Sequence, residues 1–352
     1  MKMKLWSKGT AHTRAVMRAL ICAPAMLSAC RGEMDEGLYS HGQVQVAFSV
    51  CASSGSGADC GGDDAACRSA ACDAGRSACG GVITKSVNPD EDLLWDVNLY
   101  VFGEGGLLEE HVYQTFGSGN SSSIAPLQLL KGRSWTLYAV ANAGRKLEDM
   151  SRPQLEAYKL YIAYPDGFTH GIPMAGRLSD VTVGESSQVT VPLRRMISKL
   201  SLRMDRSRLD SDACLAVSQV KVGNCPRCAS PFSENCVRTA SDVFPSGFAK
   251  SGAQVSTLNS DAGSSSSASG VSGEVELYLL ENVPQEPSDT VFCPYVEILA
   301  DYRKTSSADD ASVPVTLRFR LRRDDGYRVL RNSHYHVTVR PHMDAESLCP
   351  VL

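Results

Sequence analysis

The sequence predicts an all-β protein with two tandem β-sandwich domains and one short helix in the first. Three observations support this fold class: short segments with alternating apolar residues recur along the chain, glycine-containing turns separate them, and only one segment carries helix-start signals. Strands at this spacing are typical of sandwich domains. The 352 residues suffice for two such domains plus loops.

The N-terminus predicts a secretory signal peptide over residues 1–29. An apolar run, Ala19 to Ser28, follows a basic leader. This run has about ten residues, fewer than the roughly twenty that span a bilayer as a helix. A basic stretch, a short apolar stretch and small residues at the end are typical of exported proteins.

The signal ends in Leu27-Ser28-Ala29-Cys30, which resembles the lipobox of bacterial lipoproteins. We therefore predict lipidation at Cys30, a lipidated tether over residues 30–42 and anchoring to the outer membrane through the acyl chains. The alternative is an ordinary signal peptide with an incidental cysteine. The acidic stretch after Cys30 resembles surface-export signals of Bacteroidetes or is a solvated tether.

Thirteen cysteines bear on the compartment. Cys22 leaves with the signal and Cys30 carries lipid, so eleven remain, an odd number. In an exported protein these cysteines are expected to form disulfides, with at least one left free or paired with another chain.

The predicted N-terminal domain covers residues 43–195. Gln43 to Val50 alternates apolar and polar residues, as a half-buried strand does. Residues 51–90 contain almost no large apolar side chain, so they predict a long cysteine-rich loop. The further strands expected in this domain are 93–102, 107–116, 124–130, 135–142, 181–183 and 188–193, the last two as a hairpin around Gly184.

One helix is expected in this domain, from Pro153 to Ile162. Ser151 suits the N-cap and Pro153 suits the first turn.

Near Arg195 the chain is expected to enter a second domain, residues 196–352. Its predicted strands are 197–204, 214–222, 275–280, 295–302, 315–321 and 335–340, with a serine-rich loop over 249–272.

No enzyme motif occurs: there is no phosphate-binding glycine loop, no zinc-protease motif and no nucleophile elbow. We therefore expect no catalytic residue, cofactor or metal, and the near-neutral charge gives no reason to expect nucleic-acid binding. His334 and His336 share a strand face but lack an evident third ligand. The Cys225-Pro-Arg-Cys228 segment leaves redox activity, zinc binding with Cys214 and Cys236, or disulfides open.

Five segments, in order, resemble the Bacteroidetes fimbrillin family. They are the segments LYVFG (99–103), LYAVANAG (137–144), GIPMAG (171–176), LRRMISKL (193–200) and LRNSHYHV (330–337). The resemblance implies a type V pilus subunit with two transthyretin-like β-sandwich domains. It also implies partners: other fimbrial subunits, joined by strand exchange after an Arg-directed protease removes an N-terminal strand.

In this sequence the removable strand would be Gln43 to Val50, and the loop after it offers Arg68 and Arg76 as processing sites. The alternative is that both are ordinary loop arginines. The sequence departs from the family because only twelve residues follow Arg340, two of them prolines. This predicts an accessory tip or anchor subunit rather than a stalk subunit. The competing hypothesis is a surface lipoprotein that binds glycan or another host or bacterial ligand.

Overall fold

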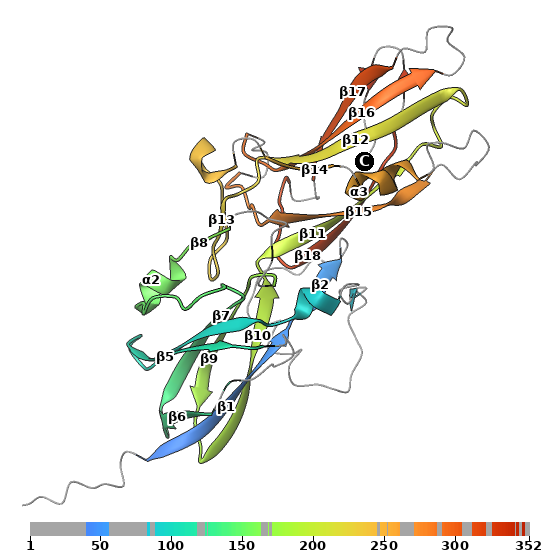
Figure 1. The fold of residues 1–352 in the computed structure, drawn as a ribbon. Helices are drawn as coiled ribbons and strands as arrows, with labels where there is room; N and C mark the ends of the chain where they lie inside the picture. The colour runs from blue at the N-terminus through green and yellow to red at the C-terminus, as the bar shows by residue number, and fades with distance from the viewer. Residues whose placement is uncertain are drawn as a thin grey trace, which may run out of the picture. The chain divides into compact units, whose positions relative to one another are not determined.

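Strands form most of the protein in this computed structural model, which confirms the all-β fold class (Figure 1). The structure describes residues 40–55, 83–84, 89–117, 124, 126–162, 168, 171–244, 247–251, 253–260, 271–286, 291–304, 312–321, 326–341, 343–344 and 347–348. In this part of the chain, no helix has the length and apolar character needed to cross a membrane.

The first sheet has seven strands in the order β5-β4-β7-β9-β10-β1-β6. The strands are β1 (His41–Val50), β4 (Asp96–Phe102), β5 (Leu108–Thr115), β6 (Leu127–Leu130), β7 (Ser134–Ala141), β9 (Met174–Thr182) and β10 (Ser186–Arg195). Apolar side chains from β1, β6 and β10 share one buried cluster with those of β4, β7 and β9. The two halves of the sheet therefore enclose a sandwich core.

The sequence predicted that residues 181–183 pair with residues 188–193 as a hairpin. This pairing is wrong. β9 and β10 pair only at Met174–Arg195 and Ala175–Arg194. Along most of its length β10 instead runs parallel to β1, which places Val189 beside Val46. Near the β9–β10 contact an ideal Cβ on Gly176 would lie 2.1 Å from the Pro192 carbonyl oxygen, so the close approach requires glycine.

The second half contains two facing sheets, with orders β15-β11-β18-β2-β3 and β14-β12-β16-β17. The strands are β2 (Ser53–Gly55), β3 (Ile83–Thr84), β11 (Ile197–Asp205), β12 (Ala213–Gly223), β14 (Phe248–Ser251), β15 (Val271–Leu280), β16 (Tyr295–Lys304), β17 (Val313–Arg320) and β18 (Ser333–Val339). Leu200 and Leu277 from one sheet and Ile298 and Leu317 from the other belong to the same buried cluster. This is the second sandwich core.

The expected helix is real but shorter than predicted. α2 (Arg152–Glu156) begins after Ser151, whose side chain takes part in a capping box with Gln154. The chain then leaves the helix because Leu160–Tyr161 (β8) pairs with Cys228–Ala229 (β13) from the second half. A backbone pairing distant in sequence thus ends the helix early.

Both predicted loops contain regular structure. Within residues 51–90, β2 and β3 pair with each other, β2 also joins β18, and Pro89–Asp92 forms the 3-10 helix η2. Within residues 249–272, α3 (Ala253–Ser256) and η4 (Thr257–Asn259) bury Val255 and Leu258 in the second core. Two apolar side chains were enough to anchor a segment that its composition predicted to be a loop.

The remaining elements are short. η3 (Ala240–Asp242) lies between β13 and β14, and β19 (Met343–Asp344) pairs with β20 (Ser347–Leu348).

Candidate functional site

The candidate site is the groove that β1 fills in the first sandwich. β1 lies between two strands: β10 runs parallel to it along residues 43–50, and β6 pairs antiparallel with residues 41–44. Beyond β6, the Ile124 N–H donates to the Val46 carbonyl oxygen at 3.1 Å, and Gln45 Nε2 donates to the Ile124 carbonyl oxygen at 2.7 Å. β1 is therefore a central strand, although it stands first in the described chain.

Alternation in the sequence gives β1 a buried face and an outer face. Val44 and Val46 are fully buried and Phe48 is 4% exposed, whereas Gln43 and Ser49 are exposed. The three apolar side chains belong to the first core. At about 25 cal/mol per Å2 of apolar surface, each contributes about 1.5–3 kcal/mol when buried. The predicted strand is confirmed, and its removal would open an apolar groove.

The start of β1 requires glycine. An ideal Cβ on Gly42 would lie 1.9 Å from the Gly184 carbonyl oxygen, well inside van der Waals contact. This contact brings β1 against the turn between β9 and β10, where the Gly184 N–H donates to Ser187 Oγ at 3.0 Å. A turn at Gly184 was predicted from the sequence, but no local sequence pattern indicates the role of Gly42.

An arginine clasp, defined here as Arg195, Asp92 and Asn332, holds the chain just after β1. Arg195 Nη1 donates to the Cys51 carbonyl oxygen at 3.2 Å and to Asn332 Oδ1 at 3.1 Å, and its Nη2 pairs with Asp92. Asn332 Nδ2 donates to the Ala52 carbonyl oxygen at 2.8 Å. Burial lowers the pKa of Arg195, and the nearby Glu91 carboxylate opposes that shift. One buried side chain thus connects both halves of the molecule.

A second charged group lies beside the clasp. Lys199 Nζ contacts Glu91 at 3.0 Å and Glu276 at 2.6 Å, and the Tyr278 hydroxyl donates to Glu91 at 2.8 Å. Burial opposes the Lys199 charge, yet the hydrogen bonds to Glu276 and Glu91 keep its pKa above the ordinary value. Since each charge has a partner, this group serves structure rather than chemistry.

The C-x-x-C segment does not have the features of a reactive thiol pair. Cys228 lies in β13 rather than at a helix start, and burial raises its pKa. A redox-active cysteine needs the opposite shift. In the described residues, no group of three or more His, Cys, Asp or Glu side chains could hold a metal ion, so zinc binding by these cysteines has no support there.

The rings of His334 and His336 lie close together, with centroids 4.0 Å apart and ring planes tilted by 37°. His334 is 7% exposed and its Nε2 hydrogen-bonds Ser201 Oγ at 2.8 Å. This arrangement is that of a satisfied core histidine.

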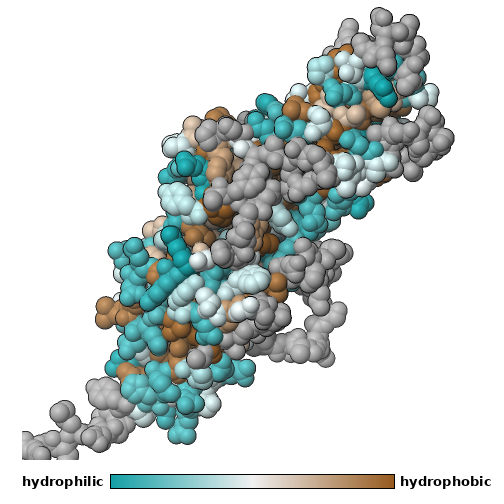
Figure 2. Space-filling view, in the orientation of Figure 1, coloured by the Kyte–Doolittle hydropathy of each residue, from teal (hydrophilic) through white to brown (hydrophobic). Residues whose placement is uncertain are grey.

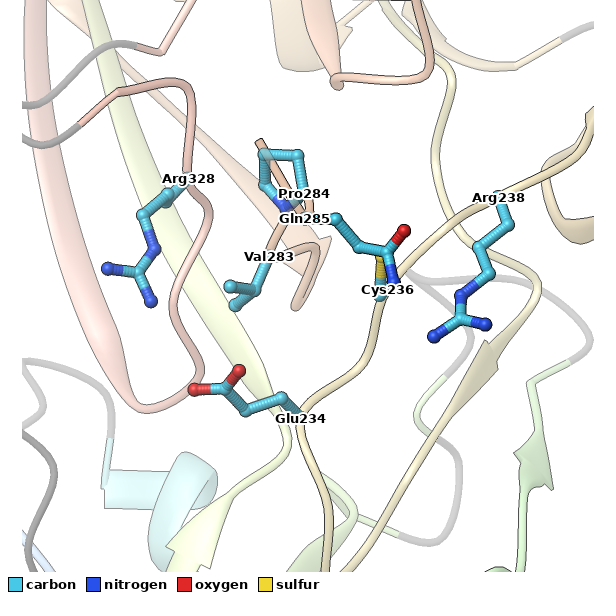
Figure 3. A pocket seen from close by; sticks show the side chains of 7 residues that line it. All are labelled: Glu234, Cys236, Arg238, Val283, Pro284, Gln285 and Arg328. Carbon is cyan, nitrogen blue, oxygen red and sulfur yellow. The ribbon is translucent and has the colours of Figure 1, made fainter. Parts of the chain in front are cut away.

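A pocket of about 450 Å3 is lined by residues from the second half of the chain (Figure 3). Its lining consists of Glu234, Cys236, Arg238, Val283, Pro284, Gln285 and Arg328. No aromatic side chain lines it, so it lacks the stacking surface typical of sugar sites. Elsewhere in the described chain, Trp95 and Tyr161 are the exposed large aromatic residues, and exposed apolar residues are scattered over the polar face in Figure 2. The glycan-binding alternative gains no support from these features.

Three sequence-predicted site residues, Cys30, Arg68 and Arg76, lie outside the described residues. Lipidation and proteolytic processing therefore stay predictions. The clasp could not be predicted from the sequence, although the domain change was expected near Arg195. An arginine that follows an apolar strand gave the only local signal, because its partners lie more than a hundred residues away.

Known structures share this arrangement. A "putative cell adhesion protein" from Parabacteroides distasonis matches with a TM-score of 0.53 and 14% identity, over 89% of this chain and 92% of that one. A protein with the same description from Bacteroides eggerthii matches with a TM-score of 0.51 and 13% identity, over 87% of each chain. The chain has the fold of these proteins. The predicted likeness to Bacteroidetes fimbrillins is thus confirmed at the level of the fold.

The tip fimbrial protein Mfa3 from Porphyromonas gingivalis is also similar, with a TM-score of 0.49 and 13% identity, over 72% of this chain and 92% of that one. No protein-family model and no curated protein matches the sequence.

Proposed function

We propose that this protein is a non-enzymatic fimbrial subunit, exported as a lipoprotein, in which a strand from a neighbouring subunit replaces β1. The observation that carries the proposal is the position of β1, which is a buried central strand followed directly by the loop that contains Arg68 and Arg76. A cut in that loop would leave β1 held by noncovalent contacts alone.

The physical basis is strand complementation. Loss of β1 would leave the facing backbone groups of β10 and β6 unpaired and expose the core side chains that Val44, Val46 and Phe48 cover. A donated strand with apolar residues at every second position would satisfy both requirements. The fold shared with cell adhesion proteins is compatible with this role.

Within the fimbrium we propose an accessory position, at the tip or at the membrane anchor, with the protein on the cell surface. In support, β19 and β20 near the end of the described chain pair with each other instead of extending as one strand. Lipid on Cys30 would provide the membrane attachment, and residues 43–195 and 196–352 would be the two domains.

A strand-exchange experiment tests the proposal. The full chain is cut with an Arg-specific protease and incubated with a fluorescent peptide that copies residues 41–52. We expect stable peptide binding only after cleavage, and none with a matched peptide that carries Val46→Asp, because the charge would face the core. The Arg68→Ala/Arg76→Ala variant should resist cutting in the loop and fail to exchange. A cleaved chain that never exchanges β1 would contradict the proposal.

Lipidation is tested separately in cells. Cys30→Ala should move the protein out of the membrane fraction, and mass spectrometry of the mature N-terminus should find lipid on Cys30 in the anchored form or a start after Arg68 or Arg76 in the processed form. Unchanged fractionation of Cys30→Ala would contradict the lipoprotein assignment.

Absence of the protein from purified fimbriae, with normal fimbriae in a deletion strain, would contradict the fimbrial role.

A further inference from the structure

Two buried cysteines lie at the same end of one strand pair in the second sandwich. Cys225 is fully buried and Cys293 is 2% exposed. Cys225 follows β12 by two residues, and Cys293 precedes β16 by two residues. These two strands pair in the antiparallel direction along their whole length.

The register of the last ladder pairs, continued two residues beyond the ladder, would bring the two cysteines opposite each other. At the end of the ladder Val222 pairs with Val296 and Gly223 with Tyr295. Two further residues along each chain lead to Cys225 and Cys293. Directly opposed residues in an antiparallel pair have Cα atoms about 4.5–5.5 Å apart, which falls within the range that a disulfide requires.

Hydrogen bonds keep the two chains together beyond the last ladder pair. The side chain of Asn224 donates from Nδ2 to the Val291 carbonyl oxygen at 3.0 Å and to the Cys293 carbonyl oxygen at 3.3 Å. Cys293 Sγ in turn contacts the Tyr327 carbonyl oxygen at 3.5 Å. Asn224 adopts a positive φ of 53°, a conformation that asparagine tolerates better than most residues.

From this geometry we propose that Cys225 and Cys293 form an intramolecular disulfide in the exported protein. Formation is a thiol–disulfide exchange with a disulfide donor such as glutathione disulfide or an exported dithiol oxidase. The two protein thiols lose two protons and two electrons and form one S–S bond, while the donor S–S bond breaks and becomes two thiols. The proposal rests on export to an oxidising compartment, which belongs to the proposed function.

The neighbouring cysteines are poorer partners. Cys228 is committed to β13, where it pairs with Tyr161, and its thiol lies near Lys159 and Asp242. Cys236 lines the pocket together with Val283 and Gln285. Neither residue lies on the continuation of the β12–β16 ladder.

The disulfide would fix the base of a crossover segment, residues 224–244. This segment leaves the second sandwich and places Ala229 and Phe232 against the first core, where the Phe232 ring meets the Tyr138 ring edge-on at 4.9 Å. The covalent bond would therefore secure a part of the second half that packs on the first.

Peptide mapping of the folded full chain tests the bond. The chain is incubated with glutathione disulfide, its remaining thiols are alkylated under denaturing conditions, and it is digested with trypsin without reduction. Trypsin separates Cys225, in peptide 222–227, from Cys228 and Cys236, in peptide 228–238, and leaves Cys293 as the one cysteine of peptide 251–303. We expect the 222–227 peptide linked to the 251–303 peptide. Alkylated Cys225 and Cys293, or a link from Cys225 to Cys228, would overturn the proposal.

Thermal unfolding gives a second readout. Reduction should lower the Tm of the oxidised wild type by about 5 °C or more, since the bond closes a long loop. The Cys225→Ala/Cys293→Ala variant should lose at least about 5 °C of the response to reductant that wild type shows, and Cys228→Ala should respond as wild type does. A wild type insensitive to reductant would overturn the proposal. If the bond forms in the purified chain but the same cysteines are thiols in native cells, export is the assumption that fails.

Discussion

At the scale of single residues, the fold depends on a missing side chain at Gly42 and a buried imidazole at His334. Gly42 permits contact with the Gly184 carbonyl, and His334 is buried beside Ser201. Neither requirement is visible in the local sequence pattern, because each is set by a neighbour from another strand.

Gly42→Ala should lower the free energy of unfolding by about 1–3 kcal/mol, since the new Cβ would overlap backbone that cannot move without disturbing the β9–β10 turn. The matched control is Gly117→Ala, because an ideal Cβ on Gly117 has no atom within 4 Å. Urea denaturation of both variants checks this. Equal effects of the two substitutions would contradict the steric argument.

Burial lowers the pKa of His334, and the neighbouring His336 and Lys199 lower it further. The folded state therefore resists protonation more than the unfolded state does. Both states hold a neutral imidazole above pH of about 6.5, so stability is fully present there and falls as the pH drops below that value. We expect the Tm of wild type to fall more steeply from pH 7 to pH 5 than that of His334→Gln. Parallel curves would exclude His334 as the source.

At the scale of the element, β1 combines a simple sequence pattern with a central position. Its alternation identified it as a half-buried strand, which the structure confirms. Its neighbours could not be predicted, because a parallel partner more than a hundred residues away leaves no local signal. The same applies to β8, whose pairing with β13 shortened the expected helix.

Phe48→Ala should lower the free energy of unfolding by about 3–5 kcal/mol, as expected when a large side chain is removed from a packed core. Ser49→Ala is the matched control on the exposed face and should change it by less than about 0.5 kcal/mol. In the exchange assay Phe48→Ala should also release β1 faster after cleavage. Chemical denaturation and the exchange rate provide the two measurements.

At the scale of the whole molecule, the described halves are joined by buried polar and aromatic contacts. The clasp links Cys51 and Asp92 to Asn332, and the crossover segment inserts Phe232 beside Tyr138. Processing in the loop after β2 would break the chain between Cys51 and Asp92 while both remain bound to Arg195. The clasp would therefore continue to hold the chain just after β1 once the loop is cut.

Arg195→Met should lower the free energy of unfolding by about 3–5 kcal/mol, because it leaves the buried partners of a charged group unsatisfied. Its neighbour Arg194 is exposed, so Arg194→Met is the matched control and should have little effect. Limited proteolysis should cut Arg195→Met more readily near residues 51–55. Indistinguishable variants would show that the clasp contributes nothing to stability.

The sequence by itself determined the all-β class, most strand positions, the start of the helix and the absence of familiar enzyme motifs, because these depend on local periodicity and turn chemistry. Its Cys30, Arg68 and Arg76 predictions still rest on sequence alone. Only the tertiary structure decided that β1 is central, that Arg195 fastens the chain after it, and that the strand before Cys225 pairs with the strand after Cys293. These features arise from contacts between residues far apart in the chain, which local patterns do not encode.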